Sequence, residues 1–223
     1  MKAESISTGR RVTLYLLLGM LVHNLTYPLT GIGGVWPALF YLFYGVLFVA
    51  ATWLLLPDRG LRMLAAGCGV AVIAAGLANS YAPGTYTKLG VFLTSIAYHA
   101  VITWVLVVYI FRATAVMADV LLAAASIYLV IGSGFAAIYG LVEWLSPGSF
   151  VTASGDPVSW QQLFYYSYVT LTTVGYGDIL PQGFLAQSFA IFQAVVGVLY
   201  TAILLARLVG LQASPSPEAR EPS

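Results

Sequence analysis

Apolar residues fill six long segments of the chain, and short stretches rich in glycine, proline and charged residues separate them. A helix of about 20 mostly apolar residues, within a range of about 17–25, is long enough to cross a lipid bilayer. The pattern therefore predicts six transmembrane helices, over residues 12–29, 35–56, 61–80, 89–111, 116–145 and 184–209.

A seventh apolar stretch, residues 160–172, is too short to cross the membrane. It follows Ser159, a favourable N-cap residue, and it runs directly into the glycine-containing segment 173–178. Non-helical backbone at membrane depth is tolerated only where it is buried in protein or lines a water-filled cavity. We therefore expect an all-α, polytopic membrane protein with a re-entrant pore helix that leads into a selectivity filter.

The distribution of lysine and arginine predicts the orientation, because cytoplasmic loops carry an excess of both. With the N-terminus inside, Lys88 is the one basic residue on the outer side. This arrangement places both termini in the cytoplasm, the filter at the outer face and the protein in the cell (inner) membrane. The basic residues on the cytoplasmic side are Lys2, Arg10, Arg11, Arg59, Arg62, Arg112, Arg207 and Arg220.

Composition excludes several classes of function. The 223 residues are 60% hydrophobic and 8% charged, whereas a soluble domain carries about 25% charged residues. A net charge of +1 without a basic run argues against a nucleic-acid partner. The single cysteine, Cys68, rules out an internal disulfide and an all-cysteine metal site. We find no phosphate-binding loop, paired-histidine metalloprotease motif or serine elbow, and we expect neither an enzyme nor a cofactor.

Residues 173–178 have the chemistry of an ion-stripping site. A pore that removes water from a potassium ion must replace it with oxygens, and backbone carbonyls do so when successive residues turn them to one side. Such a ribbon needs residues that tolerate positive φ, and Gly175 and Gly177 occupy alternate positions. The Thr173 hydroxyl adds an oxygen at the inner mouth. A glycine turn between strands is the alternative, which the flanking apolar segments disfavour.

Residues 116–209 resemble the pore module of the potassium channel superfamily: outer helix, pore helix, filter and inner helix. The segment 172–178, Thr-Thr-Val-Gly-Tyr-Gly-Asp, matches the family signature without substitution. The chain looks like a bacterial six-transmembrane-helix channel with a two-helix pore module. The resemblance implies a symmetric homotetramer in membrane lipid, with potassium as the permeant ion. It assigns the filter oxygens to Thr173, Val174, Gly175, Tyr176 and Gly177, with potassium held at the first four.

The resemblance also suggests residues that support and gate the filter. Tyr165 stands where the family has an aromatic that bonds Asp178, with Thr172 at the filter base, whereas Val169 replaces a glutamate found in some simple channels. Gly197 is a hinge or a small-residue packing contact. The remaining assignments are of two kinds. Phe164, Tyr165, Tyr166 and Tyr168 are expected to form an aromatic cuff or an interfacial belt, and Val198, Thr201 and Leu205 to line the cavity and gate.

The first four helices lack the arginine series of a voltage sensor. Residues 89–111 contain no arginine, so strong voltage gating is not expected. His23 and His99 lie in apolar segments, where they are either proton sensors or neutral side chains bonded to a carbonyl or to a hydroxyl such as Tyr98 or Thr94. Asp119 is expected to pair with Arg112 or to cap a helix.

The predicted organisation has three parts: a four-helix transmembrane unit (1–115), a pore unit (116–210) and a short disordered cytoplasmic tail (211–223), with no cytoplasmic ligand-binding domain. The leading hypothesis is a potassium-selective channel that conducts passively. The alternatives are a weakly selective cation channel, and a membrane sensor whose first four helices bind a lipid or ligand and modulate the pore.

Overall fold

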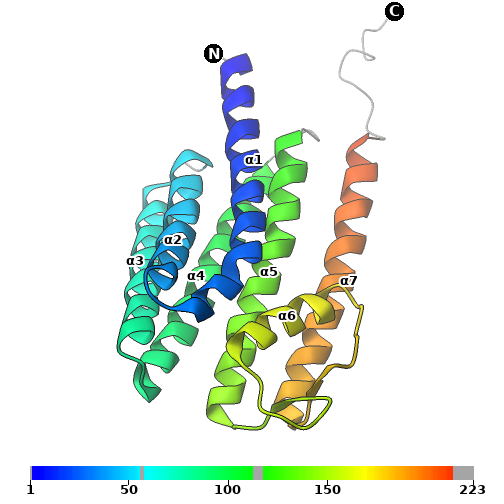
Figure 1. Cartoon of the computed structure of the whole chain (residues 1–223). Helices are drawn as coiled ribbons and strands as arrows, with labels where there is room; N and C mark the ends of the chain where they lie inside the picture. Colours follow the sequence, from blue (N-terminus) through cyan, green and yellow to red (C-terminus); the bar gives the residue numbers. More distant parts are fainter. Residues whose placement is uncertain (1, 56–57, 113–117, 213–223) are drawn as a thin grey trace, which may run out of the picture.

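A computed structural model describes residues 2–55, 58–112 and 118–212 and contains seven α-helices (Figure 1). The first four are α1 (Lys2–Thr26), α2 (Trp36–Leu55), α3 (Arg59–Tyr81) and α4 (Thr85–Arg112). The others are α5 (Ala118–Leu145), α6 (Trp160–Leu171) and α7 (Phe184–Gln212). A 3₁₀ helix, η1 (Tyr27–Ile32), follows α1, and two short strands, β1 (Phe150–Thr152) and β2 (Ile179–Pro181), flank α6.

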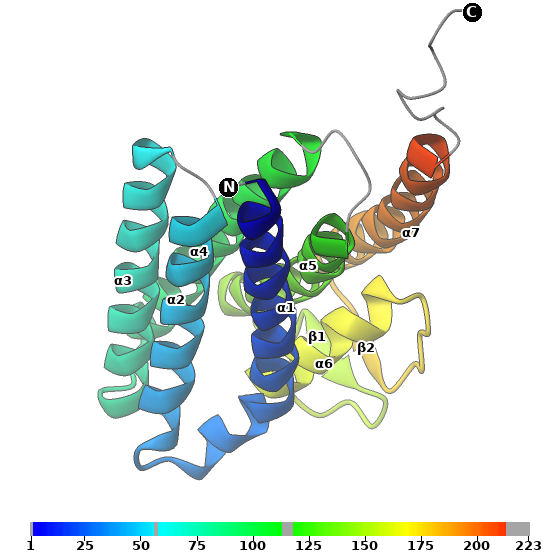
Figure 2. The ribbon, with the colours of Figure 1, turned by 90° about the horizontal axis from the view of Figure 1, so that it is seen from above.

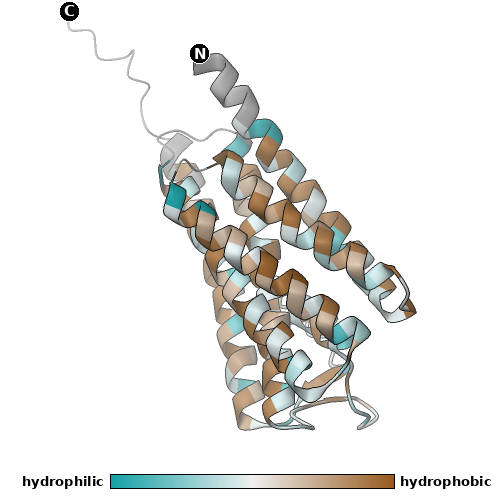
Figure 3. Cartoon of the chain, turned by 90° about the vertical axis from the view of Figure 1, so that its left-hand side faces the viewer, coloured by the Kyte–Doolittle hydropathy of each residue, from teal (hydrophilic) through white to brown (hydrophobic). Residues whose placement is uncertain are grey.

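Six of the helices in the described residues are long and apolar enough to cross a membrane, which confirms the predicted fold class. Hydrophobic residues cover most of their length (Figure 3). The short helix α6 is the predicted re-entrant helix, and it begins directly after Ser159 as expected. The strands β1 and β2 form an antiparallel pair that the sequence pattern did not predict.

Several helix ends differ from the predicted ones because local signals override hydropathy. The α1 helix ends at Thr26 instead of residue 29, because Pro28 lacks an N–H and disfavours helix at the residue before it. The α3 helix already includes Arg59 and Gly60, two residues before its predicted start at residue 61. The Asp58 carboxylate accepts the N–H of Leu61 at 2.8 Å and so caps its first turn.

The helices form a bundle in which α1 contacts α2 of its own four-helix unit and α5 of the pore unit. Seen from above, α1 lies between α2 and α5, while α6 and α7 lie beyond α5 (Figure 2). The start of α1 and the end of α7 lie at the same end of the bundle. The β1–β2 pair lies at the opposite end (Figure 1). We call the latter the filter end.

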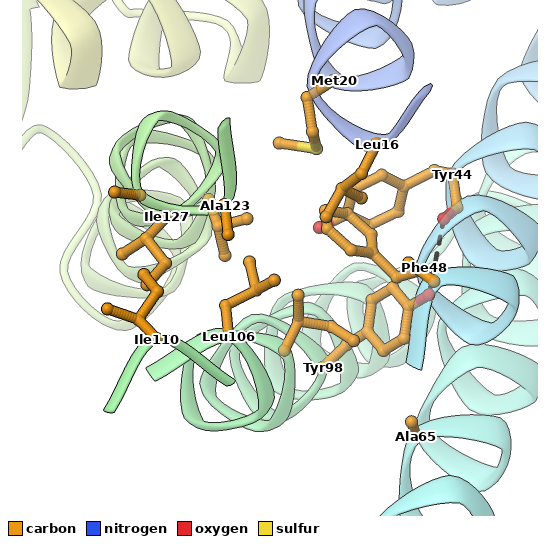
Figure 4. Packing of buried hydrophobic residues seen from close by; sticks show 14 of the residues in the cluster. Leu16, Met20, Tyr44, Phe48, Ala65, Tyr98, Leu106, Ile110, Ala123 and Ile127 are labelled. Carbon is orange, nitrogen blue, oxygen red and sulfur yellow. Dashed lines mark hydrogen bonds between the residues drawn. The ribbon is translucent and has the colours of Figure 1, made fainter. Parts of the chain in front are cut away.

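Two apolar clusters hold the bundle together. The larger joins α1–α4 to α5, and its side chains include Leu16, Phe48, Tyr98 and Ile127 (Figure 4). The smaller belongs to the pore unit and joins α5 and α6 to β1, β2 and α7. Because α5 contributes to both clusters, it joins the four-helix unit to the pore unit. The predicted boundary at residues 115 and 116, and the tail from residue 213, lie outside the described residues.

Candidate functional site

The pore helix α6 is fixed at its start by a reciprocal cap. The Ser159 hydroxyl accepts the N–H of Gln162 at 3.3 Å, and the Gln162 side chain accepts the N–H of Ser159 at 2.8 Å. This capping box satisfies two of the backbone donors that a helix leaves free at its N-terminus. The C-terminus of the helix lies between α5 and α7, because the Leu171 carbonyl accepts the Tyr128 hydroxyl at 3.1 Å and lies against Gly197. Its partial negative charge, equivalent to roughly half an electron, is therefore next to the predicted filter.

The ribbon after α6 alternates between left- and right-handed backbone. Positive φ angles occur at Thr173 (60°), Gly175 (58°) and Gly177 (76°), and not at the two residues between them. Alternating hands turn successive carbonyls toward the same side, which is the geometry that the sequence argument required. Gly175 and Gly177 adopt this conformation without strain, whereas Thr173 is a threonine held at positive φ at an energetic cost of about 1–3 kcal/mol.

Hydrogen bonds to α6 hold the ribbon in this conformation. The N–H groups of Val174 and Gly175 donate to the carbonyl of Val169 at 3.0 and 3.4 Å, and the N–H of Thr173 donates to Thr170 at 3.0 Å. The Thr172 hydroxyl donates to the carbonyl of Tyr168 at 2.7 Å. All of residues 172–178 are exposed on the surface of the single chain. The carbonyls at the two ends of this segment accept hydrogen bonds, that of Thr172 from the Thr173 hydroxyl at 2.7 Å and that of Asp178 from Ala153.

At the filter end, Asp178 is held from two directions. Its carbonyl accepts the N–H of Ala153 at 2.9 Å, next to the β1–β2 pair. The Tyr165 side chain also interacts with its carboxylate, and this interaction is the main reason that the pKa of Tyr165 is raised. The tyrosine therefore stays protonated, and able to donate, at neutral pH. Its role in supporting the ribbon stays a prediction.

Substitution of Tyr165 by Phe should accelerate the loss of conduction during sustained flux. The change removes the hydroxyl that interacts with the Asp178 carboxylate and leaves the ring in place. The decay of rubidium flux in proteoliposomes measures the effect. The control is Tyr15→Phe, because Tyr15 is 66% exposed on α1. Decay as slow as in the unmodified protein would show that the hydroxyl does not brace the filter.

The other aromatic residues of α6 do not form a cuff with Tyr165. Phe164 stacks on Tyr27 of η1, with ring centroids 4.6 Å apart. Tyr166 packs against Tyr139, at 5.2 Å, in the core of the pore unit. Consecutive helical residues point about 100° apart, so neighbouring aromatics contact different elements. Within this chain only Phe164 and Tyr168 pack on each other, at 5.2 Å, among the described aromatic pairs of the four residues, and a cuff around the assembled filter stays a prediction.

On α7, Gly197 is buried against the end of the pore helix. A Cβ atom at this position would lie 2.3 Å from the carbonyl oxygen of Leu171. Only glycine permits this approach, which supports the packing alternative; the hinge role stays a prediction. Val198, Thr201 and Leu205 follow on the same helix and are exposed on the single chain, as residues facing a cavity or another subunit would be.

A buried polar network ties α5, α6 and α7 together, and the sequence analysis missed it. Gln193 is fully buried, and its Nε2 donates to the carbonyl and hydroxyl of Ser167 at 3.0 and 2.8 Å. The Tyr139 hydroxyl donates to its Oε1, and the Ser167 hydroxyl donates to the carbonyl of Gly132 at 2.6 Å. A glutamine inside an apolar span is the signal that could have revealed this network.

A second missed link connects α1 to the pore helix. The Asn24 Nδ2 donates to the Tyr168 hydroxyl at 2.7 Å, and that hydroxyl donates to the carbonyl of Leu129 at 2.7 Å. Ser133 lies 2.9 Å from the same oxygen. Because the Tyr168 carbonyl accepts the N–H and hydroxyl of Thr172, this residue joins the first helix to the base of the filter.

Replacement of Tyr168 by Phe should weaken the filter as well as the fold. Asn24 loses its partner, and a buried unsatisfied polar group costs about 1–3 kcal/mol. We expect a lower melting temperature and a higher potassium concentration for half-maximal stabilisation of the oligomer. The control is Tyr98→Phe, which removes a buried hydroxyl bonded to Gly45 at 2.7 Å within the four-helix unit. If both variants needed the same potassium concentration for half-maximal stabilisation, the contact of α1 with Tyr168 would not influence the filter.

The two histidines lie close together in the bundle. The Nδ1 of His99 lies 2.6 Å from the carbonyl of Ser95, and its Nε2 bonds the Tyr44 hydroxyl. Nδ1 therefore donates and Nε2 accepts, which favours the neutral alternative, with Tyr44 in place of the expected Tyr98 or Thr94. His23 stacks between two aromatic rings, at centroid distances of 4.2 and 4.3 Å. Proton sensing by either residue stays a prediction.

Two other expectations concern charges and metals. The Asp119 carboxylate accepts a hydrogen bond from the Tyr109 hydroxyl at 2.5 Å, which is its partner in place of the expected Arg112. Within the described ranges, no group of three or more His, Cys, Asp or Glu side chains could hold a metal ion.

A comparison with protein families matches residues 99–211 to the family described as "ion channel". This is just over half of the chain, so the protein belongs to that family. The match covers α5, α6, the ribbon and α7, together with the second half of α4. This match confirms the predicted membership of the potassium channel superfamily. The family is one of channels rather than enzymes.

Individual relatives match shorter parts. Two-pore potassium channel 2 of Arabidopsis thaliana is 36% identical over 69 residues, or 31% of this chain and 15% of its own length. Two pore potassium channel c of Oryza sativa subsp. japonica is 36% identical over 63 residues, or 28% and 14%. Protein LctB of Bacillus caldotenax is 36% identical over 87 residues, or 37% and 64%. The chain thus spans about one seventh of the plant relatives. No solved structure matches it.

Proposed function

We propose that the protein is a potassium-selective channel that conducts ions passively through a pore shared by four copies of the chain. The observation that supports this most directly is the ribbon after α6, with positive φ at Thr173, Gly175 and Gly177 and its residues exposed. Such a ribbon replaces the hydration shell of a potassium ion with carbonyl oxygens. Two relatives named as potassium channels support the choice of ion.

One chain supplies one ribbon, so the ring of oxygens requires other copies. Four signature loops form the filter of a potassium channel, and a closed ring of identical chains has cyclic symmetry. The apolar side chains of α7 also favour assembly, because Val198 and Leu205 are 55% and 58% exposed on the single chain. Each pore helix would then direct roughly half a negative charge at the central cavity, where a cation most needs stabilisation.

The proposed setting is the cell (inner) membrane, with both termini in the cytoplasm and the filter facing out. The basic residues on the cytoplasmic side support this orientation. Strong voltage dependence is not part of the proposal, because the only arginine of α4 is Arg112, at its end. Each charge moved through the membrane would contribute about 2.3 kcal/mol per 100 mV, and α4 carries no lysine or arginine between Lys88, near its start, and Arg112, at its end.

Rubidium and sodium flux through purified protein in liposomes tests the proposal. A potassium-selective pore should pass rubidium and exclude sodium at equal concentrations. Equal flux of both ions would favour the weakly selective cation channel instead. The absence of any flux from a correctly assembled tetramer would favour the sensor alternative, in which the first four helices bind a ligand and the pore is not the output.

A further inference from the structure

An elongated cavity of about 490 Å³ lies between the first four helices and the pore unit. Its lining on α4 runs from Lys88, near the start of that helix, to His99 in the middle. This part of a helix rises about 16 Å, whereas the hydrocarbon core of a bilayer is about 30 Å thick. The cavity therefore extends from the filter end of the bundle to about the middle of the membrane.

The polar groups at the inner end of the cavity are already occupied or covered. Both nitrogens of His99 bond protein atoms, and the Ser133 hydroxyl bonds the carbonyl of Leu129 at 3.2 Å. The Nδ1 of His23 has no partner among the described residues, but it is covered by protein atoms and a ligand cannot reach it. The walls are mainly apolar and include Phe92, Leu163 and Phe164. This end suits a hydrocarbon chain better than a ligand that forms hydrogen bonds.

The mouth of the cavity carries a free positive charge. Lys88 is exposed, and its ammonium has no partner in the part of the chain that the structure describes. The other charged lining residue, Glu143, is turned toward its own loop, where its carboxylate accepts the N–H groups of Gly148 and Phe150 at 2.8 and 2.9 Å. Trp144 and Trp160 also line the mouth. Tryptophan favours the membrane–water interface, which places Lys88 at the depth of lipid headgroups.

We propose that this cavity binds one phospholipid, with its phosphate at Lys88 and one acyl chain in the slot. The chain would contact Phe92 of α4 on one side and Leu163 and Phe164 of α6 on the other. A bound lipid thus touches both the four-helix unit and the pore helix that carries the filter. Any effect of the lipid on flux rests on the proposed channel function, whereas its binding does not.

Native mass spectrometry of the purified oligomer, titrated with palmitoyl-oleoyl phosphatidylglycerol, tests the site. Lys88→Gln should weaken binding about two- to fivefold, the range for one partly exposed ion pair. Ala137 is buried and lines the slot on α5, so Ala137→Leu should fill it and reduce binding at least about tenfold, because the added atoms leave no room for the chain. Dioleoylglycerol, which has acyl chains and no phosphate, should bind as weakly as the phospholipid binds Lys88→Gln.

Two variants serve as matched controls. Arg11→Gln removes an exposed charge on α1, far along the bundle from the filter end, and Ala100→Leu adds the same volume to an exposed position of α4. Both should bind like the unmodified protein. Equal binding by Lys88→Gln, Ala137→Leu and these controls would overturn the proposal, because it would indicate lipid around the whole bundle.

A second measurement keeps the test decisive if Ala137→Leu fails to fold. A phospholipid with a photoreactive group in its acyl chain should label Phe92 or Leu163 of the unmodified protein. Labelling confined to exposed residues such as Leu39 or Val46 would overturn the proposal. Specific labelling without rubidium flux would overturn the proposed channel function and support the lipid site. Rubidium flux without specific labelling would support the channel and overturn the lipid site.

Discussion

Gly177→Asp is expected to abolish rubidium flux while the oligomer remains assembled. Gly177 has a φ of 76° and nothing within 4 Å of where a Cβ would lie, so an aspartate fits sterically. The left-handed backbone costs an L-residue about 1–2 kcal/mol, and aspartate tolerates it better than most. In a four-fold assembly, however, four carboxylates would surround the conduction axis. Flux assays combined with size-exclusion chromatography measure both parts of the prediction.

Gly155→Asp is the matched control for that variant. Gly155 has a φ of 89° in an exposed turn and likewise has nothing within 4 Å of where a Cβ would lie, so the backbone cost and the added charge are the same. It lies outside the ribbon, and we expect normal flux. If Gly177→Asp also conducted normally, residues 173–177 would not be the filter.

Gly197→Ala should both destabilise the protein and stop conduction. The new methyl group would lie 2.3 Å from the Leu171 carbonyl oxygen and 3.2 Å from its carbon, and backbone atoms cannot move aside cheaply. Overpacking of this kind costs about 1–3 kcal/mol. Because Leu171 ends the pore helix, displacing it also displaces the ribbon. The melting temperature of the oligomer and its rubidium flux should therefore both be lower than in the unmodified protein.

Gly67→Ala is the corresponding control. Gly67 also lies within a membrane-spanning helix, but it is exposed and nothing lies within 4 Å of an added Cβ. Alanine favours helix over glycine by about 1 kcal/mol, so this variant should be as stable as the original or slightly more so. A Gly197→Ala protein with unchanged melting temperature and altered opening would instead support the hinge.

The contacts of α1 change how the four-helix unit is understood. On sequence grounds, residues before 116 were a separate part whose role was open. In the structure, Asn24 bonds the pore helix through Tyr168, and Tyr27 stacks on Phe164 at 4.6 Å. Coupling between that unit and the filter can therefore act through α1 and the pore helix. It does not require charges on α4 or movement of the connection between α4 and α5.

The sequence by itself determined the elements and the chemistry of the filter. Helices that cross a membrane, the cap at Ser159 and the alternating glycines at 175 and 177 depend on residues close together in the chain, so hydropathy, capping and φ preferences reveal them. The family resemblance also suggested that Tyr165 and Asp178 interact, because it places both residues next to the same ribbon.

Only the tertiary structure decided which helix faces meet. Asn24 and Tyr168 are 144 positions apart, Tyr139 and Gln193 are 54 apart, and nothing in a local pattern specifies that such pairs touch. The same holds for the contact of Gly197 with the Leu171 carbonyl and for the cavity below Lys88. In a membrane, an apolar face packs equally well against lipid or another helix, so hydropathy does not distinguish them. Close packing and paired polar groups, which depend on the three-dimensional arrangement, make that choice.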